Sequence, residues 1–221
     1  ITENTAAVIL ETIQGGAGFI VPKKDYLKKV KARCEAVGAL LILDEIQSGI
    51  GRTGQFFGFQ HYGIIPDSLV TGKGLGGGMP IGAFISSGAN MSLLTENPKL
   101  GHITTFGGQP VIAASALATL KELFRSTLSE QTLTKEQLIR KLLVHEQIIE
   151  IRGKGLMLAL ILKDAQRANK LVLEAVQQGL LLFWLLYEPR AVRLTPPLNI
   201  SEQEIKKGCG IILCNLNNLA G

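Results

Sequence analysis

The sequence predicts an α/β protein with a mostly parallel sheet, followed by a smaller α+β part. Residues 6–11 and 40–44 are apolar almost without interruption, as strands buried on both faces are, and an amphipathic stretch separates them. A strand, a helix and a second strand in this order form a βαβ unit with parallel strands. After about residue 130 the pattern changes to short strands that alternate with helices. We therefore divide the chain into residues 1–130 and 131–221.

Each element of the first part has its own signal. Residues 22–37 predict a helix, because they start at a proline, end before Gly38 and carry lysines opposite an apolar face. The predicted apolar face consists of Tyr26, Leu27, Val30 and Cys34. Two short strands and three loops are predicted next, the strands at 68–71 and 82–87 and the loops at 49–62, 72–81 and 102–110. The last loop leads into an alanine-rich helix over residues 111–124.

The second part begins with a predicted helix, from residue 131 to about residue 145. Strands are predicted where apolar residues gather in short runs, at 149–152, 156–162, 180–186 and 191–194. Two further helices are predicted near residues 164–178 and 201–219. This mixture predicts a small α+β domain.

The composition argues against several classes of protein. The net charge is +5 and the pI about 9.2, but Lys and Arg are scattered and only 5% of the residues are aromatic, which does not suit a nucleic-acid surface. The three cysteines are odd in number and lack metal-binding spacing, so we expect a reducing, cytoplasmic location and no metal site. The longest apolar run, residues 180–187, is too short for a membrane span. The chain starts without methionine and runs directly into a strand, so we expect it to begin inside a domain.

The most informative residue is Lys73, which follows a short apolar run. Glycines at positions 72, 74, 76–78 and 82 surround it, so few side chains could keep a bulky partner away. Such a lysine has three interpretations: part of a phosphate-binding loop, a nucleophile that forms a Schiff base, or an exposed charge on a loop.

A P-loop fits poorly. It needs glycine six positions before the lysine and a hydroxyl residue after it, whereas Asp67 and Gly74 occupy these positions. The other Gly-Lys pair ends at Lys154 and has Ile148 where the first glycine is required. Two matches to the dinucleotide-binding glycine pattern, at 49–54 and 72–77, do not open helices, so a Rossmann site is a weak alternative.

A Schiff-base lysine agrees better with the rest of the chain. A pyridoxal phosphate enzyme combines such a lysine with a carboxylate that keeps the cofactor's ring nitrogen protonated. Asp44 stands at the carboxyl end of a predicted parallel strand, where α/β sheets bind their ligands, and Lys73 follows a later strand. These two residues supply the required pair.

Three segments in order resemble the class III aminotransferases, and within that class they are most similar to the acetylornithine and ornithine aminotransferase branch. They are LDEIQSGIGRTG (43–54), TGKGLGGGMPIGA (71–83) and TTFGGQP (104–110). ETIQG (11–15), IRGKGLM (151–157) and VRLTPPL (192–198) extend the similarity to nearly the whole chain. The resemblance implies a fold-type I transferase that depends on pyridoxal 5′-phosphate (PLP). Residues 1–130 would be the carboxyl-terminal part of its large domain, and residues 131–221 its small α+β domain.

At the matching positions, the resemblance implies roles in cofactor binding. Lys73 would form the aldimine with PLP and then move a proton between the substrate carbon and the cofactor. Asp44 would pair with the ring nitrogen, Ile46 would pack on the ring face and Gln47 would reach the phenolic oxygen. In an extended chain residues 44 and 46 point to one side and residue 47 to the other, so we expect a bend here. As an isolated residue, Ile46 would instead be interpreted as part of the core.

The resemblance also implies a partner subunit and a substrate. Thr105 would bind the cofactor phosphate of a neighbouring subunit, which implies a homodimer; a helix-capping or turn threonine is the alternative. Arg193 would bind the substrate α-carboxylate, whereas Arg152 is expected to be structural. The implied reaction moves the terminal amine of an ornithine-like, N-acylated or other ω-amino acid donor to 2-oxoglutarate. An aminomutase or decarboxylase of the same fold, and an inactive incomplete fragment, are the alternatives.

The sequence departs from the family pattern at Gly16. Ornithine-type enzymes carry a glutamate there, which pairs with the substrate-binding arginine and gates it between a diamine donor and a dicarboxylate acceptor. Because glycine has no carboxylate, we expect Arg193 to bind a carboxylate in both half-reactions. The amino-terminal part of the family pattern, which supplies a glycine-rich helix start and an acceptor-binding arginine, is absent from this sequence.

Overall fold

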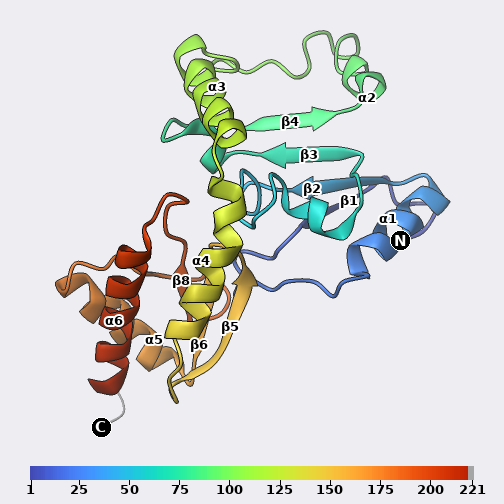
Figure 1. The fold of residues 1–221 in the computed structure, drawn as a ribbon. Helices are drawn as coiled ribbons and strands as arrows, with labels where there is room; N and C mark the ends of the chain where they lie inside the picture. Colours follow the sequence, from blue (N-terminus) through green and yellow to red (C-terminus); the bar gives the residue numbers. More distant parts are fainter. Residues whose placement is uncertain (219–221) are drawn as a thin grey trace. The chain divides into compact units, whose positions relative to one another are not determined.

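The computed structural model describes residues 1–218, which form two compact units (Figure 1). The first unit consists of Ile1–Thr12, Lys23–Ile50 and Phe57–Ser126. The second consists of Ile13–Pro22, Gly51–Phe56 and the chain from Thr127 onward. Each unit is built around a four-stranded sheet.

The sheet of the first unit has the strand order β1-β2-β3-β4. β2 runs parallel to both β1 and β3, and β4 is antiparallel to β3. The strands are β1 (Ala7–Glu11), β2 (Leu40–Asp44), β3 (Ser68–Thr71) and β4 (Ala83–Ser86). The helices are α1 (Tyr26–Val37), α2 (Gly88–Ser92) and α3 (Pro110–Arg125), with the short 3₁₀ helices η1 (Gly58–Tyr62) and η2 (Lys73–Gly76). The predicted βαβ unit is confirmed, and β1, β2 and β3 have their carboxyl ends at one edge of the sheet.

Helix α1 covers one face of this sheet. Its buried residues pack with β2 in a cluster that contains Leu27, Val30, Cys34, Leu41 and Leu43. Val8 and Leu10 pack against this cluster, and the alternation of side chains along a strand directs Ile9 to the other face. Ile9 is 68% exposed, so the prediction that residues 6–11 are buried on both faces is wrong.

The carboxyl end of α1 was predicted correctly, but its amino end was not. The helix begins at Tyr26 and not at Pro22, because residues 23–25 form a turn in which the Tyr26 N–H donates to the Lys23 carbonyl (2.9 Å). Tyr26 therefore lies at the exposed start of the helix and not on its buried face. Gly38 ends the helix as predicted, with the left-handed φ of 76° that glycine adopts without strain.

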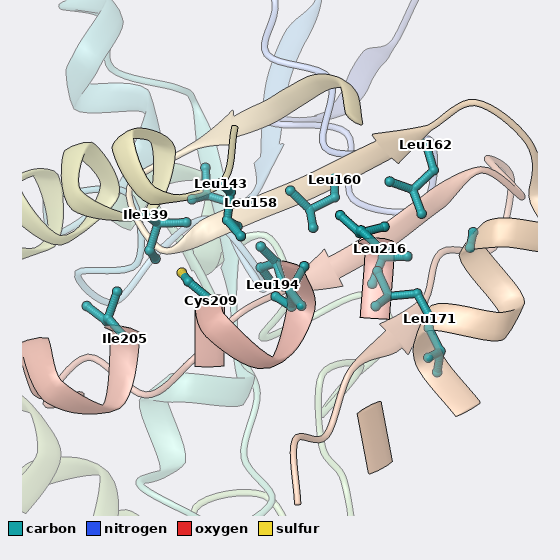
Figure 2. Close-up of a cluster of buried hydrophobic side chains, with 14 of the residues drawn as sticks. Ile139, Leu143, Leu158, Leu160, Leu162, Leu171, Leu194, Ile205, Cys209 and Leu216 are labelled. Carbon is teal, nitrogen blue, oxygen red and sulfur yellow. The ribbon is translucent and has the colours of Figure 1, made fainter. Parts of the chain in front are cut away.

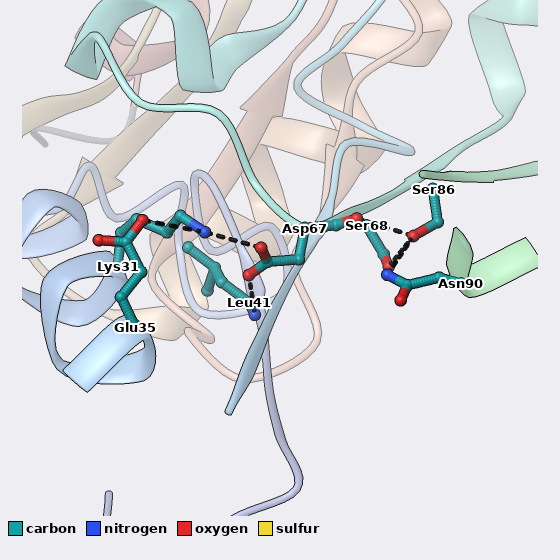
Figure 3. A network of polar contacts seen from close by, with 7 residues as sticks. All are labelled: Lys31, Glu35, Leu41, Asp67, Ser68, Ser86 and Asn90. Carbon is teal, nitrogen blue, oxygen red and sulfur yellow. Dashed lines mark hydrogen bonds and ion pairs between the residues drawn. The ribbon is translucent and has the colours of Figure 1, made fainter. Parts of the chain in front are cut away.

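A polar network fixes the starts of β2 and β3 (Figure 3). The Asp67 carboxylate accepts hydrogen bonds from Lys31 Nζ (2.8 Å) and from the Leu41 N–H (2.8 Å). Partial burial alone would raise the pKa of Asp67, but the Lys31 ammonium and the Leu41 N–H outweigh it and hold the pKa below its usual value. The hydroxyl of Ser68, the next residue, donates to Ser86 Oγ on β4 (2.9 Å).

We expect this network to make the stability of the first unit depend on pH. Because the folded state lowers the pKa of Asp67, its carboxylate stabilises the fold fully above the ordinary value of 3.8, and this contribution is lost as the pH falls through the lowered pKa. Asp67→Asn should lower the free energy of unfolding by about 1–3 kcal/mol at neutral pH and flatten its decline at acid pH. Urea unfolding at pH 7 and at about pH 3 measures both effects. Asp25→Asn, which removes only an exposed ion pair with Lys29, is the control, and equal losses in the two variants would contradict the prediction.

The second unit has an antiparallel sheet with the strand order β5-β6-β8-β7. Its elements are α4 (Leu128–Leu142), β5 (Ile148–Lys154), β6 (Met157–Leu162), α5 (Ala165–Gln177), β7 (Phe183–Trp184), β8 (Ala191–Leu194) and α6 (Glu202–Asn218). One face of β6 packs in the main core of this unit with α4, α5 and α6 (Figure 2), through a cluster that includes Ile139, Leu158, Leu160, Leu171, Leu194, Ile205 and Leu216. Its other face packs against Ile13 and Phe19. All six residues of β6 are therefore buried.

Several predicted boundaries in this unit were wrong. Helix α4 begins at Leu128 and not at residue 131, because only Ser126 and Thr127 separate it from α3. Only Phe183 and Trp184 of the predicted strand 180–186 pair with β8, so the flanking leucines lie outside the ladder. The predicted end of the last helix, Leu219, lies outside the described residues. None of the helices described between residues 1 and 218 is long and apolar enough to cross a membrane.

Candidate active site

The first unit places Asp44 and Lys73 at the same edge of its sheet. β2 and β3 end side by side, with Asp44 opposite Val70, and Lys73 follows directly after β3. The N–H of Glu45 donates to the Val70 carbonyl (2.8 Å), so the pairing continues past the end of β2. The parallel arrangement thus brings together the two residues that the sequence singled out.

Lys73 begins η2 with a left-handed backbone, φ 41°, which residues with a Cβ rarely adopt. Its surroundings hold it in this conformation. A Cβ at Gly72 would lie 3.2 Å from the Ile81 carbonyl oxygen, so the chain passes too closely there for most side chains. At the other end of η2, the Ser115 hydroxyl of α3 donates to the Gly76 carbonyl (2.8 Å). The lysine itself is exposed, on a turn anchored on both sides.

Asp44 is half-buried and has an oxygen available for a ligand. Its Oδ1 accepts the N–H of Ile46 (2.8 Å), and the carboxylate makes no other hydrogen bond or ion pair within residues 1–218. Ile46 is also half-buried, with Cγ1 3.7 Å from the position of a Cβ at Gly72. Gln47 makes no hydrogen bond to any described residue. An apolar side chain next to a free carboxylate oxygen and a free amide suits a flat ring with polar groups at its edge.

Glu45 was missed by the sequence analysis, although it follows Asp44 directly. It is fully buried, and its carboxylate accepts hydrogen bonds from two hydroxyls and two backbone N–H groups. The Gly49 N–H donates to the Glu45 carbonyl (3.0 Å), which closes the bend that was predicted after Ile46. The only feature of the sequence that could have pointed to Glu45 was the presence of a second carboxylate at the end of an apolar strand.

Thr105 lies apart from these contacts, on the exposed turn before α3. It makes no hydrogen bond to another residue in the described range. Its neighbours Ile103 and Phe106 are 69% and 82% exposed, which is unusual for apolar side chains.

Arg193 belongs to the second unit, on β8. Its Nε donates to Thr195 Oγ1 (2.9 Å), and Nη1 of Arg52 donates to the neighbouring Pro196 carbonyl (2.5 Å). Burial, and then the charge of Arg193, lower the pKa of Arg52 to about 10. The two guanidinium groups are thus close enough to repel each other.

Neither Arg52 nor Arg193 has an acidic partner among residues 1–218. Arg152 differs, because Glu150 (2.8 Å) and Glu188 (3.6 Å) both form ion pairs with it. Arg152 therefore has acidic partners of its own, and its structural role stays a prediction. Two adjacent cations without a carboxylate favour binding of an anion.

Gly16 packs directly against Tyr187. A Cβ at position 16 would lie 3.0 Å from Cδ2 of the Tyr187 ring, and the Tyr187 N–H donates to the Gly16 carbonyl (2.9 Å). The tyrosine is 79% exposed, so its ring has room to move. A larger residue at position 16 therefore requires the ring to be displaced.

Comparison with known protein families gives a match over nearly the whole chain. The family model described as "Aminotransferase class-III" matches residues 1–215. Putrescine aminotransferase from Pectobacterium atrosepticum is 44% identical over 209 residues, which cover 91% of this chain and 44% of that protein. Acetylornithine aminotransferase from Mycobacterium leprae is 43% identical over 209 residues, which cover 93% of this chain and 50% of that protein. The chain spans about half the length of these curated relatives.

Solved structures give the same result. An ornithine aminotransferase from Toxoplasma gondii, with PLP at partial occupancy in its active site, matches with a TM-score of 0.89 and 32% identity. The match covers 99% of this chain and 52% of that one. N-acetylornithine aminotransferase from Stenotrophomonas maltophilia matches with a TM-score of 0.86 and 32% identity, over 99% of this chain and 58% of that one.

Proposed function

The chain belongs to the class III aminotransferase family, and from this premise we propose that the protein is a PLP-dependent transaminase. When bound, PLP supplies an electron sink that stabilises negative charge on the amine-bearing carbon of a substrate. The observation that carries the proposal is that Asp44 and the exposed, glycine-flanked Lys73 lie at the same edge of the sheet. In this proposal residues 1–130 belong to the cofactor-binding domain, and the chain from residue 131 belongs to a small domain.

We infer the following roles for the residues of this edge. Lys73 Nζ would hold the cofactor covalently and, when free, would carry the proton that moves to and from the substrate carbon. Asp44 would hold the ring nitrogen through the carboxylate oxygen that Ile46 leaves free, and its negative charge would favour the protonated nitrogen. Ile46 would pack against the ring face, and the amide of Gln47 would hold the phenolic oxygen.

We propose that Arg193 binds the substrate carboxylate. The absence of an acidic partner for Arg193 and Arg52 within residues 1–218 supports this role, because the pair favours an anion. Gly16 supplies no carboxylate to compete for Arg193. The donor would then be a short aliphatic compound with a terminal amine and a carboxylate, such as an N-acylated ornithine, and 2-oxoglutarate would accept the amine.

We propose that the protein acts as a homodimer in which Thr105 reaches the cofactor phosphate of the partner subunit. The exposed apolar residues Ile103 and Phe106 on both sides of Thr105 support this, because exposed apolar side chains mark contact surfaces. The free hydroxyl of Thr105 is available to donate to a phosphate oxygen.

A panel of amine donors tests this function. The purified protein with PLP and 2-oxoglutarate is given N-acetylornithine, ornithine or putrescine, and glutamate is measured. We expect kcat/KM for N-acetylornithine to exceed that for putrescine by about tenfold or more, because N-acetylornithine offers Arg193 a carboxylate and putrescine has none. A preference for putrescine would contradict the role of Arg193 in donor binding. Product formation without glutamate would favour an aminomutase or decarboxylase, and no reaction with any donor would favour an inactive fragment.

A further inference from the structure

The carboxylate of Glu45 is the most extensively hydrogen-bonded side chain near the candidate site, and no role above uses it. Oε1 accepts the Thr12 hydroxyl (2.6 Å) and the Phe59 N–H (2.7 Å), and Oε2 accepts the Ser48 hydroxyl (2.5 Å) and the Gly58 N–H (2.9 Å). The residue is 0% exposed. Each oxygen therefore has two donors and no access to water.

None of the four donors carries a charge, and Glu45 forms no ion pair with a described residue. A buried carboxylate without a cation is expensive to desolvate, and the four hydrogen bonds that it accepts offset this cost by tying neighbouring segments to it. A simple contribution to the core is therefore a poor explanation for Glu45. Fixing the conformation of the surrounding chain is a better one.

The donors come from three separate segments of the first unit. Thr12 follows β1, Ser48 lies in the bend after β2, and Gly58 and Phe59 begin η1. A Cβ at Gly58 would lie 3.1 Å from Glu45 Oε2, so glycine allows this N–H to approach closely. The carboxylate thus joins the segments that surround the bend.

The main chain of Glu45 connects this network to Asp44. The Glu45 N–H donates to the Val70 carbonyl (2.8 Å). The N–H of the next residue, Ile46, donates to Asp44 Oδ1 (2.8 Å). A shift of the bend would move the Ile46 N–H and release one oxygen of Asp44. The orientation of the Asp44 carboxylate therefore depends on the position of Glu45.

We propose that Glu45 is a positioning residue that sets the direction in which Asp44 meets the ring nitrogen of PLP. The inference rests on the proposed function, because it assigns Asp44 the same contact. Glu45 touches neither cofactor nor substrate and acts only through the bend and Asp44.

Two variants test the inference with little change in volume. Glu45→Gln replaces an oxygen that accepts two hydrogen bonds with an NH₂ group that can accept neither, and Thr12→Val removes one hydroxyl donor. We expect the apparent Kd for PLP to rise about tenfold in Thr12→Val and further in Glu45→Gln. Thr12→Ser keeps the hydroxyl and should bind PLP like the unaltered protein.

Two readouts separate positioning from general destabilisation. In the cofactor-free protein, amide hydrogen exchange at Ile46 and Gly49 should become faster in Thr12→Val than in the unaltered protein. In the PLP-loaded protein, the pH midpoint of the visible absorbance should shift, because Asp44 no longer holds the same contact with the ring. Ser68→Ala is the control, since it removes another buried hydroxyl bond of this sheet and should change stability but neither readout.

The outcomes distinguish this inference from the proposed function. Slower or unchanged exchange at Ile46 and Gly49 in Thr12→Val, or an unchanged Kd and pH midpoint, would overturn the role of Glu45 alone. If Glu45→Gln does not fold, the measurements on Thr12→Val alone can still support or overturn the role of Glu45. An unaltered protein that takes up no PLP would overturn both proposals.

Discussion

Replacing Lys73 with alanine is expected to abolish covalent binding of PLP and to reduce amine transfer by about 10³-fold or more. The reason is geometric as well as chemical. Lys73 is an exposed residue on an anchored turn, at the edge of the sheet where the strand that carries Asp44 ends. No neighbouring lysine shares this position: the next ones along the chain are Lys31 and Lys99.

Borohydride reduction of the PLP-loaded protein, followed by peptide mass mapping, measures this effect directly. A single pyridoxyl group on Lys73 is expected in the unaltered protein, and none in Lys73→Ala. Lys24→Ala is the matched control, because Lys24 is an exposed lysine before α1. Label spread over many lysines, or activity that survives in Lys73→Ala, would show that Lys73 is not the nucleophile.

Replacing Gly153 with alanine is expected to destabilise the second unit by about 3 kcal/mol or more. Gly153 has a left-handed φ of 103°, and a Cβ there would overlap the Met157 carbonyl oxygen and lie 3.1 Å from Leu158 Cα. Met157 and Leu158 belong to β6, which is buried throughout and has no room to move away. The midpoint of thermal unfolding should fall by about 10–20 °C.

Gly210→Ala provides the matched control in the same unit. Gly210 lies within α6, is exposed and has no atom within 4 Å of the position that a Cβ would take. Alanine should therefore raise stability by about 0.5–1 kcal/mol, as it does inside helices generally. Thermal unfolding of both variants, followed by calorimetry or circular dichroism, shows whether each substitution raises or lowers stability. Equal effects would mean that the conformation of Gly153 does not matter to folding.

Apolar runs bounded by turn residues predicted strands well where the strand lies between two other strands of its sheet. Residues 68–71 and 191–194 were predicted with the bounds that the structure has. The run 180–186 was equally apolar, but only two of its residues pair with β8. The burial of residues 6–11 failed for a related reason, since a run of apolar residues does not reveal whether a layer covers each face.

The candidate site was predicted as far as strand topology determines it. Parallel strands end at one edge, so a carboxylate after β2 and a lysine after β3 had to lie near each other. The left-handed backbone of Lys73 and the burial of Glu45 could not be predicted in this way. Both depend on segments distant in sequence, α3 for the lysine turn and Thr12 and η1 for Glu45.

The antiparallel pairing of β3 with β4 also bears on the order in which the chain folds. The connection between these strands is short, so its closure costs less conformational entropy than the crossover through α1 that parallel β1 and β2 require. Contacts between residues close in sequence form sooner than distant ones. We therefore expect the lysine turn and the β3–β4 pair to acquire their structure before the parallel pairing of β1 with β2.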